Sequence, residues 1–291
     1  MQIIDGKKAS AEIRVELKKR IAELKGKGII PGLATILVGE DPASEVYVAN
    51  KIKACGELGI KSSHHKLSAG AGEPEIIARI EKLNADPAVN GILLQLPLPR
   101  GLNAEKALDT ISPKKDVDGL HPHNIGLLCS AKSWDELVSK KLLMSCTPYG
   151  SILLLKKYGI EIAGKTAVVV GRSNLAGKPV AMMLLANNAT VTVAHSKTKD
   201  LAGVCRSADI LVAAIGIPKM IKKDFVKPGA AVIDIGINRT RDGLCGDVDF
   251  EEVKDIAGWL TPVPGGVGAM TITMLMKNTL TACESQNETK L

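Results

Sequence analysis

The sequence predicts an α/β protein of two α/β domains, the second with a Rossmann-type doubly wound parallel sheet. Apolar runs of strand length alternate with helical patterns along the 291 residues, which is typical of parallel α/β architecture. A glycine-rich stretch follows the apolar run 166–170, as in many doubly wound sheets. A new unit begins at Cys146-Thr147-Pro148, so we predict a domain boundary near residue 145.

The first domain begins with a helix. An apolar residue recurs every three or four positions from Ile13 to Leu24, and Ser10 is the expected N-cap. Strands and helices then alternate in the order strand, helix, strand, helix, strand, at 33–38, 43–58, 61–67, 73–84 and 91–95. The prolines at 97 and 99 end the last strand, because proline cannot donate to a sheet ladder.

The second domain starts with a helix for which Thr147 is the expected N-cap and Pro148 the first helical residue. Four strands are expected in it, at 166–170, 190–194, 210–214 and 231–235. A C-terminal helix at about 271–291 is expected to return to the first domain. The predicted domains are therefore 1–145 with that helix, and 146–270.

The composition excludes several classes of protein. Hydrophobic residues make up 45% and charged residues 24%, the balance of a globular protein, and no apolar run approaches the ~18 residues of a membrane span. Acidic residues interrupt the N-terminus before a signal peptide could form, so we expect a cytoplasmic protein with no membrane partner.

The charge pattern and the cysteines exclude further partners. The net charge of +7 comes from scattered pairs, and only two Trp, three Tyr and two Phe are present, so no nucleic-acid partner is expected. Six widely spaced cysteines without a Cys-x-x-Cys pair, and no His/carboxylate cluster, lead us to expect no metal site.

The glycine-rich turn reads Gly171-Arg172-Ser173 and continues to Gly177-Lys178-Pro179. Glycines between a strand and a helix let backbone amides approach a phosphate at the helix N-terminus. Ser173 departs from the common G-x-G-x-x-G spacing, and five residues between the glycines exclude a P-loop. By itself the turn also fits a purely structural role.

The end of the next strand favours one dinucleotide. Domains that bind NAD usually carry an acidic residue there for the ribose hydroxyls. This strand instead ends in His195-Ser196-Lys197, which with Arg172 suits the 2′-phosphate of NADP. We therefore expect NADP rather than NAD.

Tyr47 and Lys51 share one face of a predicted helix, with Ser44 one turn earlier. Tyr-x-x-x-Lys is also the spacing of short-chain dehydrogenases, but there the pair follows the glycine turn in the same domain. Here it precedes the turn by over a hundred residues, so we reject that interpretation. Gln95 ends a buried strand, where a polar side-chain amide normally has a functional role.

Specific motifs extend over the whole chain, namely Ser44-Glu45-Val46-Tyr47-Val48-x-x-Lys51, Leu94-Gln95-Leu96-Pro97-Leu98, Asp116-Val117-Asp118-Gly119, Gly171-Arg172-Ser173, Gly246-Asp247-Val248-Asp249-Phe250, and 261–268 followed by Met270-Thr271. With them the sequence resembles the bifunctional methylenetetrahydrofolate dehydrogenase/methenyltetrahydrofolate cyclohydrolase family. The departures are few, and one is Ala269 where proline is usual, which would loosen its loop.

The resemblance implies two consecutive reactions in a substrate cleft between the domains. Hydride passes from 5,10-methylenetetrahydrofolate to NADP, and water then opens the methenyl product to 10-formyltetrahydrofolate. Lys51 would be the catalytic lysine, Gln95 would orient it or the water, Tyr47 would stack on the folate, and Asp118 would bind the pterin. Other implied substrate contacts are Leu96, Pro97, Pro264, Gly265 and Gly268. Implied NADP contacts are Gly171, Arg172, Ser173, Ser196 and Ile237.

The resemblance also implies a homodimer in one-carbon metabolism, serving purine, histidine and methionine synthesis. Two alternatives remain at this point. A monofunctional NADP-dependent methylenetetrahydrofolate dehydrogenase would lack effective hydrolysis, and Lys51 with Gln95 argues against it. A non-catalytic folate-binding relative would form no NADPH.

Overall fold

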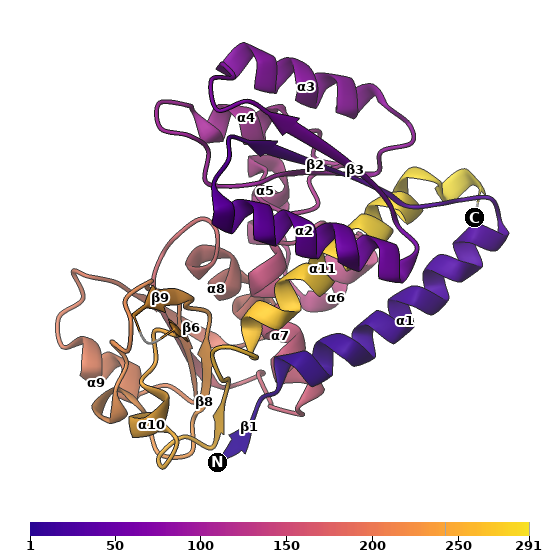
Figure 1. Ribbon diagram of the computed structural model, residues 1–291. Coiled ribbons are helices and arrows are strands. Elements are labelled where there is room, and N and C mark those ends of the chain that lie inside the picture. Colours follow the sequence, from indigo (N-terminus) through magenta and orange to yellow (C-terminus); the bar gives the residue numbers. More distant parts are fainter. Residues whose placement is uncertain (242, 291) are drawn as a thin grey trace. The chain divides into compact units, whose positions relative to one another are not determined.

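The structure is a computed structural model that describes residues 1–241 and 243–290 (Figure 1). The chain divides into two compact units. Unit 1 consists of Met1–Glu12, Leu128–Lys140 and Ser145–Met274, and unit 2 of Ile13–Leu127, Lys141–Met144 and Leu275–Leu291. Three short segments that we predicted in the first domain, 1–12, 128–140 and 271–274, thus belong to unit 1, as does Ser145. The exact domain boundaries stay a prediction.

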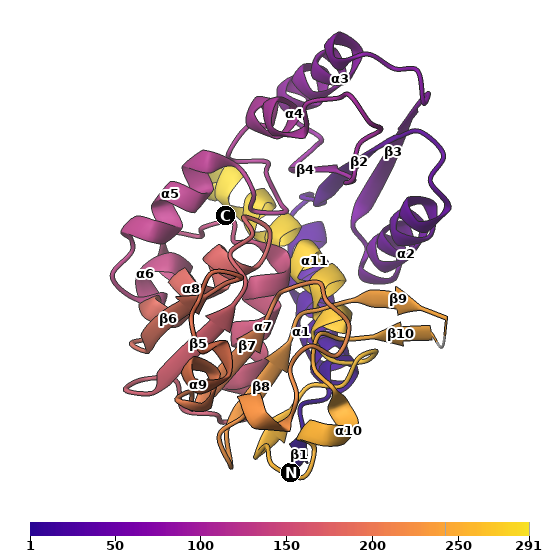
Figure 2. The same ribbon diagram turned by 90° about the vertical axis from the view of Figure 1, so that its left-hand side faces the viewer.

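Unit 2 is built on a three-stranded parallel sheet. β2 (Gly32–Val38) lies in the middle and pairs with β3 (Lys61–Leu67) and β4 (Gly91–Leu94). Every residue of β2 is buried, as expected for a parallel strand covered on both faces. α3 (Glu73–Ala85) and α4 (Ala104–Thr110) supply a core with Ile36 and Ile92, and α2 (Pro42–Leu58) packs on β2 and β3 (Figure 2).

Local signals define both ends of α2. The Asp41 side chain accepts a hydrogen bond from Ser44 N at 2.8 Å, and Pro42 stands in the first turn, where its missing N–H costs nothing. Gly59 ends the helix with φ of 81°, a left-handed conformation that glycine adopts readily. These caps hold in place a helix that carries two predicted site residues.

Unit 1 contains a six-stranded sheet in which every pairing is parallel, with the order β1-β11-β8-β7-β5-β6. Its strands are β1 (Gln2–Ile3), β5 (Thr166–Val170), β6 (Thr190–Ala194), β7 (Ile210–Ala213), β8 (Ala231–Asp234) and β11 (Trp259–Leu260). β5 has β6 on one side and β7 on the other, so the strand order reverses there. Such a switch point is where open α/β sheets bind ligands.

Helices cover both faces of this sheet. α9 (Leu201–Arg206) and α10 (Phe250–Val253) join Val168 and Val170 in one apolar core. The intervening Val169 is fully buried too, because α8 (Gly177–Ala186) packs on β5 and β6, with α7 (Cys146–Lys157) against it. The predicted α/β fold with a doubly wound parallel sheet is confirmed.

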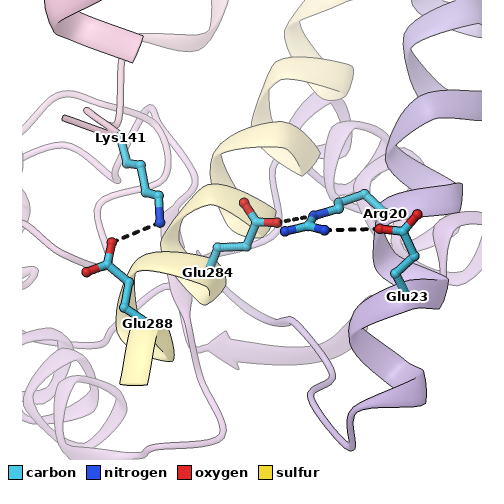
Figure 3. A network of polar contacts seen from close by, with 5 residues as sticks. All are labelled: Arg20, Glu23, Lys141, Glu284 and Glu288. Atoms are coloured by element: carbon cyan, nitrogen blue, oxygen red, sulfur yellow. Dashed lines mark hydrogen bonds and ion pairs between the residues drawn. The ribbon is translucent and has the colours of Figure 1, made fainter. Parts of the chain in front are cut away.

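The remaining elements are the helices α1 (Gly6–Gly26), α5 (Pro122–Ser130), α6 (Trp134–Ser139) and α11 (Val267–Gln286), the 3₁₀ turns Lys223–Phe225 and Glu288–Lys290, and the antiparallel pair β9 (Asn238–Thr240) and β10 (Gly243–Cys245). In unit 2, ion pairs surround the C-terminal turns of α11: Arg20 binds Glu284 and Glu23, and Lys141 binds Glu288 (Figure 3).

Most predicted elements lie within a few residues of their expected bounds, but two predicted caps are wrong. α1 begins at Gly6, so Ser10 lies inside it, where its hydroxyl contacts the Thr273 hydroxyl at 2.6 Å. α7 begins at Cys146 with Ser145 as N-cap, and Thr147 contacts Thr271 at 3.0 Å. In both cases a hydroxyl has a distant tertiary partner, which local sequence does not reveal.

Candidate active site

In unit 2 the structure brings together two predicted residues. Lys51, on α2, donates from Nζ to Gln95 Oε1 at 2.8 Å. Gln95 follows β4, and its backbone N–H extends the sheet by bonding Ile36 O at 2.9 Å. Its side-chain amide donates to Leu96 O at 2.6 Å. The amide therefore has one orientation, with its oxygen towards the lysine.

Tyr47 lies one turn before Lys51 on α2, and 47% of its surface is exposed. Residues four apart on a helix share a face, so Tyr47 and Lys51 project from the same side of α2. An exposed aromatic ring on a capped helix offers a flat apolar surface for a planar ligand. Leu96 and Pro97 continue directly from Gln95, with Leu96 half-buried and Pro97 exposed.

The loop with Asp118 is anchored by the residues before it. Lys115 Nζ donates to the carbonyls of Leu83 and Asp86 at 3.1 and 2.7 Å, at the C-terminus of α3, where a cation is favourable. Asp116, 2% exposed, accepts hydrogen bonds from His121 N and Asn124 Nδ2 at 2.8 and 2.9 Å. Burial raises the pKa of Asp116, although these two hydrogen bonds oppose the rise.

Asp118 itself is only partly buried. Asp116 forms a parallel bridge with Ile92 of β4, so the chain after it runs towards the carboxyl end of that strand, where Gln95 lies. Val117 O accepts a hydrogen bond from Asn278 Nδ2 at 2.8 Å, which fixes the residue before Asp118. The neighbouring carboxylates thus differ: Asp116 holds the loop and Asp118 is accessible.

In unit 1 the glycine-rich turn lies at the switch point of the sheet. Gly171 follows β5 with φ of 122°, and a Cβ there would lie 2.0 Å from Ala214 O, at the end of β7. A Cβ on Gly177, the first residue of α8, would lie 2.3 Å from Gly171 O. Both positions therefore require glycine, because the turn packs closely against the end of β7 and against itself.

The side chains of the turn have different environments. Ser173 Oγ accepts hydrogen bonds from the N–H groups of Ala176 and Gly177 at 3.2 and 3.4 Å, so its hydroxyl also shapes the turn. Arg172 is exposed. So is Ser196, which follows β6 in a turn where His195 N donates to Thr198 Oγ1 at 2.9 Å.

The loop 262–268 is held within unit 1. Gly265 has φ of 114°, and its carbonyl accepts a hydrogen bond from Lys7 N at 3.1 Å. A Cβ on Gly268 would lie 3.1 Å from Ile237 Cδ1, so two predicted contacts are neighbours. Ala269 N donates to Gly266 O at 3.1 Å. Proline has no N–H and could not form this hydrogen bond. Alanine therefore adds a backbone hydrogen bond to the loop 262–268, whereas we expected it to loosen that loop.

Sequence reasoning assigned no role to two buried carboxylates at the same edge of the unit 1 sheet. Asp234 ends β8 and is 3% exposed, and Asp247 is fully buried. Burial raises the pKa of Asp234 to about 7. The signal in the sequence was a glycine close to each aspartate. A Cβ on Gly236 would lie 2.2 Å from the Asp247 carboxylate, and a Cβ on Gly246 would lie 1.8 Å from the Asp234 carboxylate.

The groups at this edge fit a dinucleotide. The Gly171–Gly177 cradle, the turn between β5 and the N-terminus of α8, lies where the backbone amides of such folds bind a phosphate. Cationic and hydroxyl donors suited to a further phosphate are exposed at Arg172 and Ser196. Exposed apolar side chains at Leu175, Ile217 and Ile237 offer contacts for rings.

None of the helices within 1–241 and 243–290 combines the length and apolar character needed to cross a membrane. In the same ranges, no three His, Cys, Asp or Glu side chains gather in an arrangement that could hold a metal ion.

By its fold and its glycine cradle, unit 1 defines a dinucleotide-binding α/β domain of Rossmann type. Residues 145–287 match the NAD(P)-binding domain of tetrahydrofolate dehydrogenase/cyclohydrolase, and residues 4–118 match the catalytic domain of the same family. The chain belongs to the tetrahydrofolate dehydrogenase/cyclohydrolase family. The predicted family resemblance is thereby confirmed.

Individual relatives agree over nearly the full length. The bifunctional protein FolD of Moorella thermoacetica is 55% identical over 97% of this chain and 98% of that protein. The crystal structure of the bifunctional FolD enzyme of Campylobacter jejuni has a TM-score of 0.92 and 47% identity, covering 98% and 99% of the two chains. The Trypanosoma brucei enzyme, complexed with NADP cofactor and an inhibitor, has a TM-score of 0.89, 38% identity and 97% coverage of both chains.

Proposed function

We propose that Lys51 handles the proton in the hydrolytic half of a bifunctional reaction and that Gln95 positions it. The chain is a bifunctional folate enzyme that oxidises 5,10-methylenetetrahydrofolate with NADP and hydrolyses the methenyl product to 10-formyltetrahydrofolate. The observation that supports the assignment of Lys51 is its 2.8 Å hydrogen bond to Gln95, whose amide is oriented in turn by Leu96 O.

The oxidation places few chemical demands on the chain. The nitrogen next to the methylene carbon supplies its lone pair as hydride leaves, which forms the methenyl cation, so no protein base is required. Bound NADP supplies the hydride acceptor. The residues of the chain contribute by orienting the reactants, and alignment of this kind can account for a large part of a barrier.

Hydrolysis does require proton transfer. Water adds to the methenyl carbon and loses one proton to a base. The proton of the resulting hydroxyl then passes to a ring nitrogen as the bond between that nitrogen and the carbon breaks and the formyl C=O forms. The positive charge of the methenyl substrate favours the neutral amine of Lys51, the form that accepts a proton. Gln95 Oε1, already within 2.8 Å of Nζ, would hold the amine in place through both transfers.

Asp118 and Tyr47, both of unit 2, are assigned to folate recognition. Asp118 would accept paired hydrogen bonds from the aminopyrimidine edge of the pterin, a geometry that suits a carboxylate. The exposed ring of Tyr47 would stack on the planar rings of the substrate. The remaining contacts are assigned to Leu96, Pro97, Pro264, Gly265 and Gly268.

NADP is assigned to the carboxyl edge of the unit 1 sheet. Gly171 and Ser173 shape the phosphate turn, and Ile237 offers an apolar contact beside Gly268. Arg172 and Ser196 would bind the 2′-phosphate, since no carboxylate follows β6 to bind free ribose hydroxyls. The NADP bound in the Trypanosoma brucei relative supports this choice of cofactor.

A monofunctional dehydrogenase is the second candidate, because a silkworm relative with 42% identity is a 5,10-methylenetetrahydrofolate dehydrogenase. Lys51→Gln separates the two candidates. It should lower cyclohydrolase activity by ~10²–10⁴-fold, the usual contribution of general acid–base catalysis, while dehydrogenase activity stays measurable. The methenyl intermediate, followed by its near-ultraviolet absorbance, should accumulate.

Lys53→Gln is the matched control, since Lys53 lies on the same helix with 75% of its side chain exposed. It should leave both activities unchanged. Lys51→Arg should rescue poorly, because a guanidinium does not lose its proton near neutral pH. A wild-type enzyme that forms NADPH without hydrolysing the methenyl compound would establish the monofunctional alternative. Hydrolysis by Lys51→Gln at the wild-type rate would refute the role of the lysine.

Assembly, compartment and pathway complete the proposal. We assign the chain to a homodimer in the cytoplasm, without nucleic-acid or membrane partners. Its product would supply one-carbon units to purine, histidine and methionine synthesis. Light scattering of the purified protein tests the assembly: a mass of twice 30.7 kDa supports it, and a mass of 30.7 kDa contradicts it.

A further inference from the structure

We infer that Asp247 is a positioning residue for NADP, because its buried carboxylate ties together the two loops that leave β7 and β8 at the cofactor edge. This inference deepens the proposed function, since it rests on the assignment of NADP to that edge. Asp247 itself is fully buried. It would act through the loops that it holds.

The carboxylate bonds both loops at once. Oδ2 accepts hydrogen bonds from the N–H groups of Ile215 and Gly216, which follow β7, at 2.6 and 2.9 Å. Oδ1 accepts from Asn238 Nδ2, which follows β8, at 2.8 Å. Three hydrogen bonds from two separate loops thus converge on one buried side chain.

A second carboxylate fixes the tie. Asp234 Oδ1 accepts hydrogen bonds from the N–H groups of Gly236 and Asp247 at 2.9 and 3.0 Å, and Oδ2 accepts from Val248 N at 2.9 Å. The backbone that carries the Asp247 side chain is thus held from β8. Because Gly236 closes over the Asp247 carboxylate without room for a Cβ, the loop after β8 is shaped to this side chain.

The tied loops contain groups that the proposed function assigns to NADP. Ile237 lies between Gly236 and Asn238, and 48% of its surface is exposed. The loop after β7 begins at Ala214, whose carbonyl packs against Gly171 at the switch point. Loss of the tie would therefore free both loops beside the dinucleotide. The Lys51–Gln95 pair belongs to unit 2, whereas Asp247 and the loops that it ties belong to unit 1.

The two activities of the enzyme make the test specific, because hydrolysis of added methenyltetrahydrofolate consumes no NADP. Asp247→Ala should raise the dissociation constant of NADP in calorimetry, and its Michaelis constant, by about tenfold or more, because the untied loops must then be ordered when NADP binds. The kcat at saturating NADP and the cyclohydrolase rate should change by less than about threefold. Asp247→Asn, which keeps one acceptor oxygen, should have a smaller effect.

Asp209→Asn is the matched control. Asp209 also ties strands of this sheet, accepting from Thr166 N at 3.0 Å and from Lys227 at 2.7 Å, but at the opposite, amino edge. It should not change NADP affinity. If Asp247→Ala does not fold, Asn238→Ala removes the 2.8 Å bond alone and should weaken NADP binding in the same direction.

Two outcomes would overturn the inference. In one, NADP affinity stays at the wild-type value in the folded Asp247 and Asn238 variants. In the other, cyclohydrolase rate and NADP affinity fall in the same proportion, as a loss of overall structure would produce. A wild-type enzyme without cyclohydrolase activity would instead refute the proposed function, and NADP calorimetry on the same variants would still decide the role of Asp247.

Discussion

The two units prepare their functional groups in different ways. Unit 2 presents side chains: Lys51, Gln95 and Asp118 project from well-capped or anchored segments. Unit 1 presents backbone, since Gly171 and Gly177 approach their neighbours so closely that a methyl group would collide. Changing a side chain in unit 2 should therefore lower binding or catalysis. Adding a Cβ to one of these glycines in unit 1 should instead distort the backbone.

Buried carboxylates serve both units as anchors. Asp116 in unit 2 and Asp247 in unit 1 each accept hydrogen bonds from backbone N–H groups and from an asparagine side chain. The difference lies in what they hold. Asp116 fixes the loop that carries Asp118, whose carboxylate is accessible. Asp247 instead ties together the loops that follow β7 and β8. Four substitutions test the contrast, in order of decreasing expected effect.

Gly171→Ala should be the most damaging. At φ of 122° and 2.0 Å from Ala214 O, a Cβ brings both backbone strain and overpacking, together about 2–6 kcal/mol of unfolding free energy. Urea unfolding and NADP calorimetry measure the loss. Gly56→Ala, on α2 with open space around it, should be neutral or stabilising by up to about 1 kcal/mol. Equal stability of the two variants would contradict the contrast between the units.

Asp118→Ala should weaken folate binding by about 10- to 100-fold and lower both activities together, because both substrates carry the same pterin. Asp118→Asn should recover part of the affinity, and neither variant should unfold more easily. Asp116→Asn should instead destabilise the fold, since its carboxylate is 2% exposed and bonded by His121 and Asn124. Calorimetry with folate and thermal unfolding separate the two carboxylates. Unchanged folate affinity in Asp118→Ala would exclude it from pterin binding.

Arg172→Ala should raise the Michaelis constant for NADP by about tenfold, as expected for a lost charge-assisted hydrogen bond to phosphate, and leave that for NAD nearly unchanged. Arg172 is exposed, so stability should not change. Steady-state kinetics with each cofactor measure the effect. If both constants rise equally, Arg172 does not recognise the 2′-phosphate.

The smallest effect is expected at the surface. Arg20→Gln removes the ion pairs to Glu284 and Glu23 around the end of α11 (Figure 3), but the arginine side chain is 49% exposed. Exposed ion pairs contribute about 0–1 kcal/mol each, and salt screens them. Thermal unfolding at low and high salt should show a small loss that disappears at high salt. A loss as large as that of Gly171→Ala would show that our view of unit 2 is incomplete.

Some features of the protein were determined by the sequence itself. β5 and β6 occupy the residues predicted for them, because β-branched and apolar runs between turn residues are local patterns. The glycine-rich turn was recognisable because close backbone contact permits only glycine at such positions. The motifs also led to the right family before any geometry was known.

Other features were decided by tertiary structure. Lys51 and Gln95 are 44 residues apart, and only the folded sheet brings Nζ to the amide. Asp116 and Asp118 look alike in the sequence, yet burial makes one an anchor and leaves the other accessible. Asp247 can tie two loops only because the fold places the ends of β7 and β8 side by side. A polar group binds the partner that folding places nearest, and burial removes the competing water, so these roles depend on contacts that no local pattern contains.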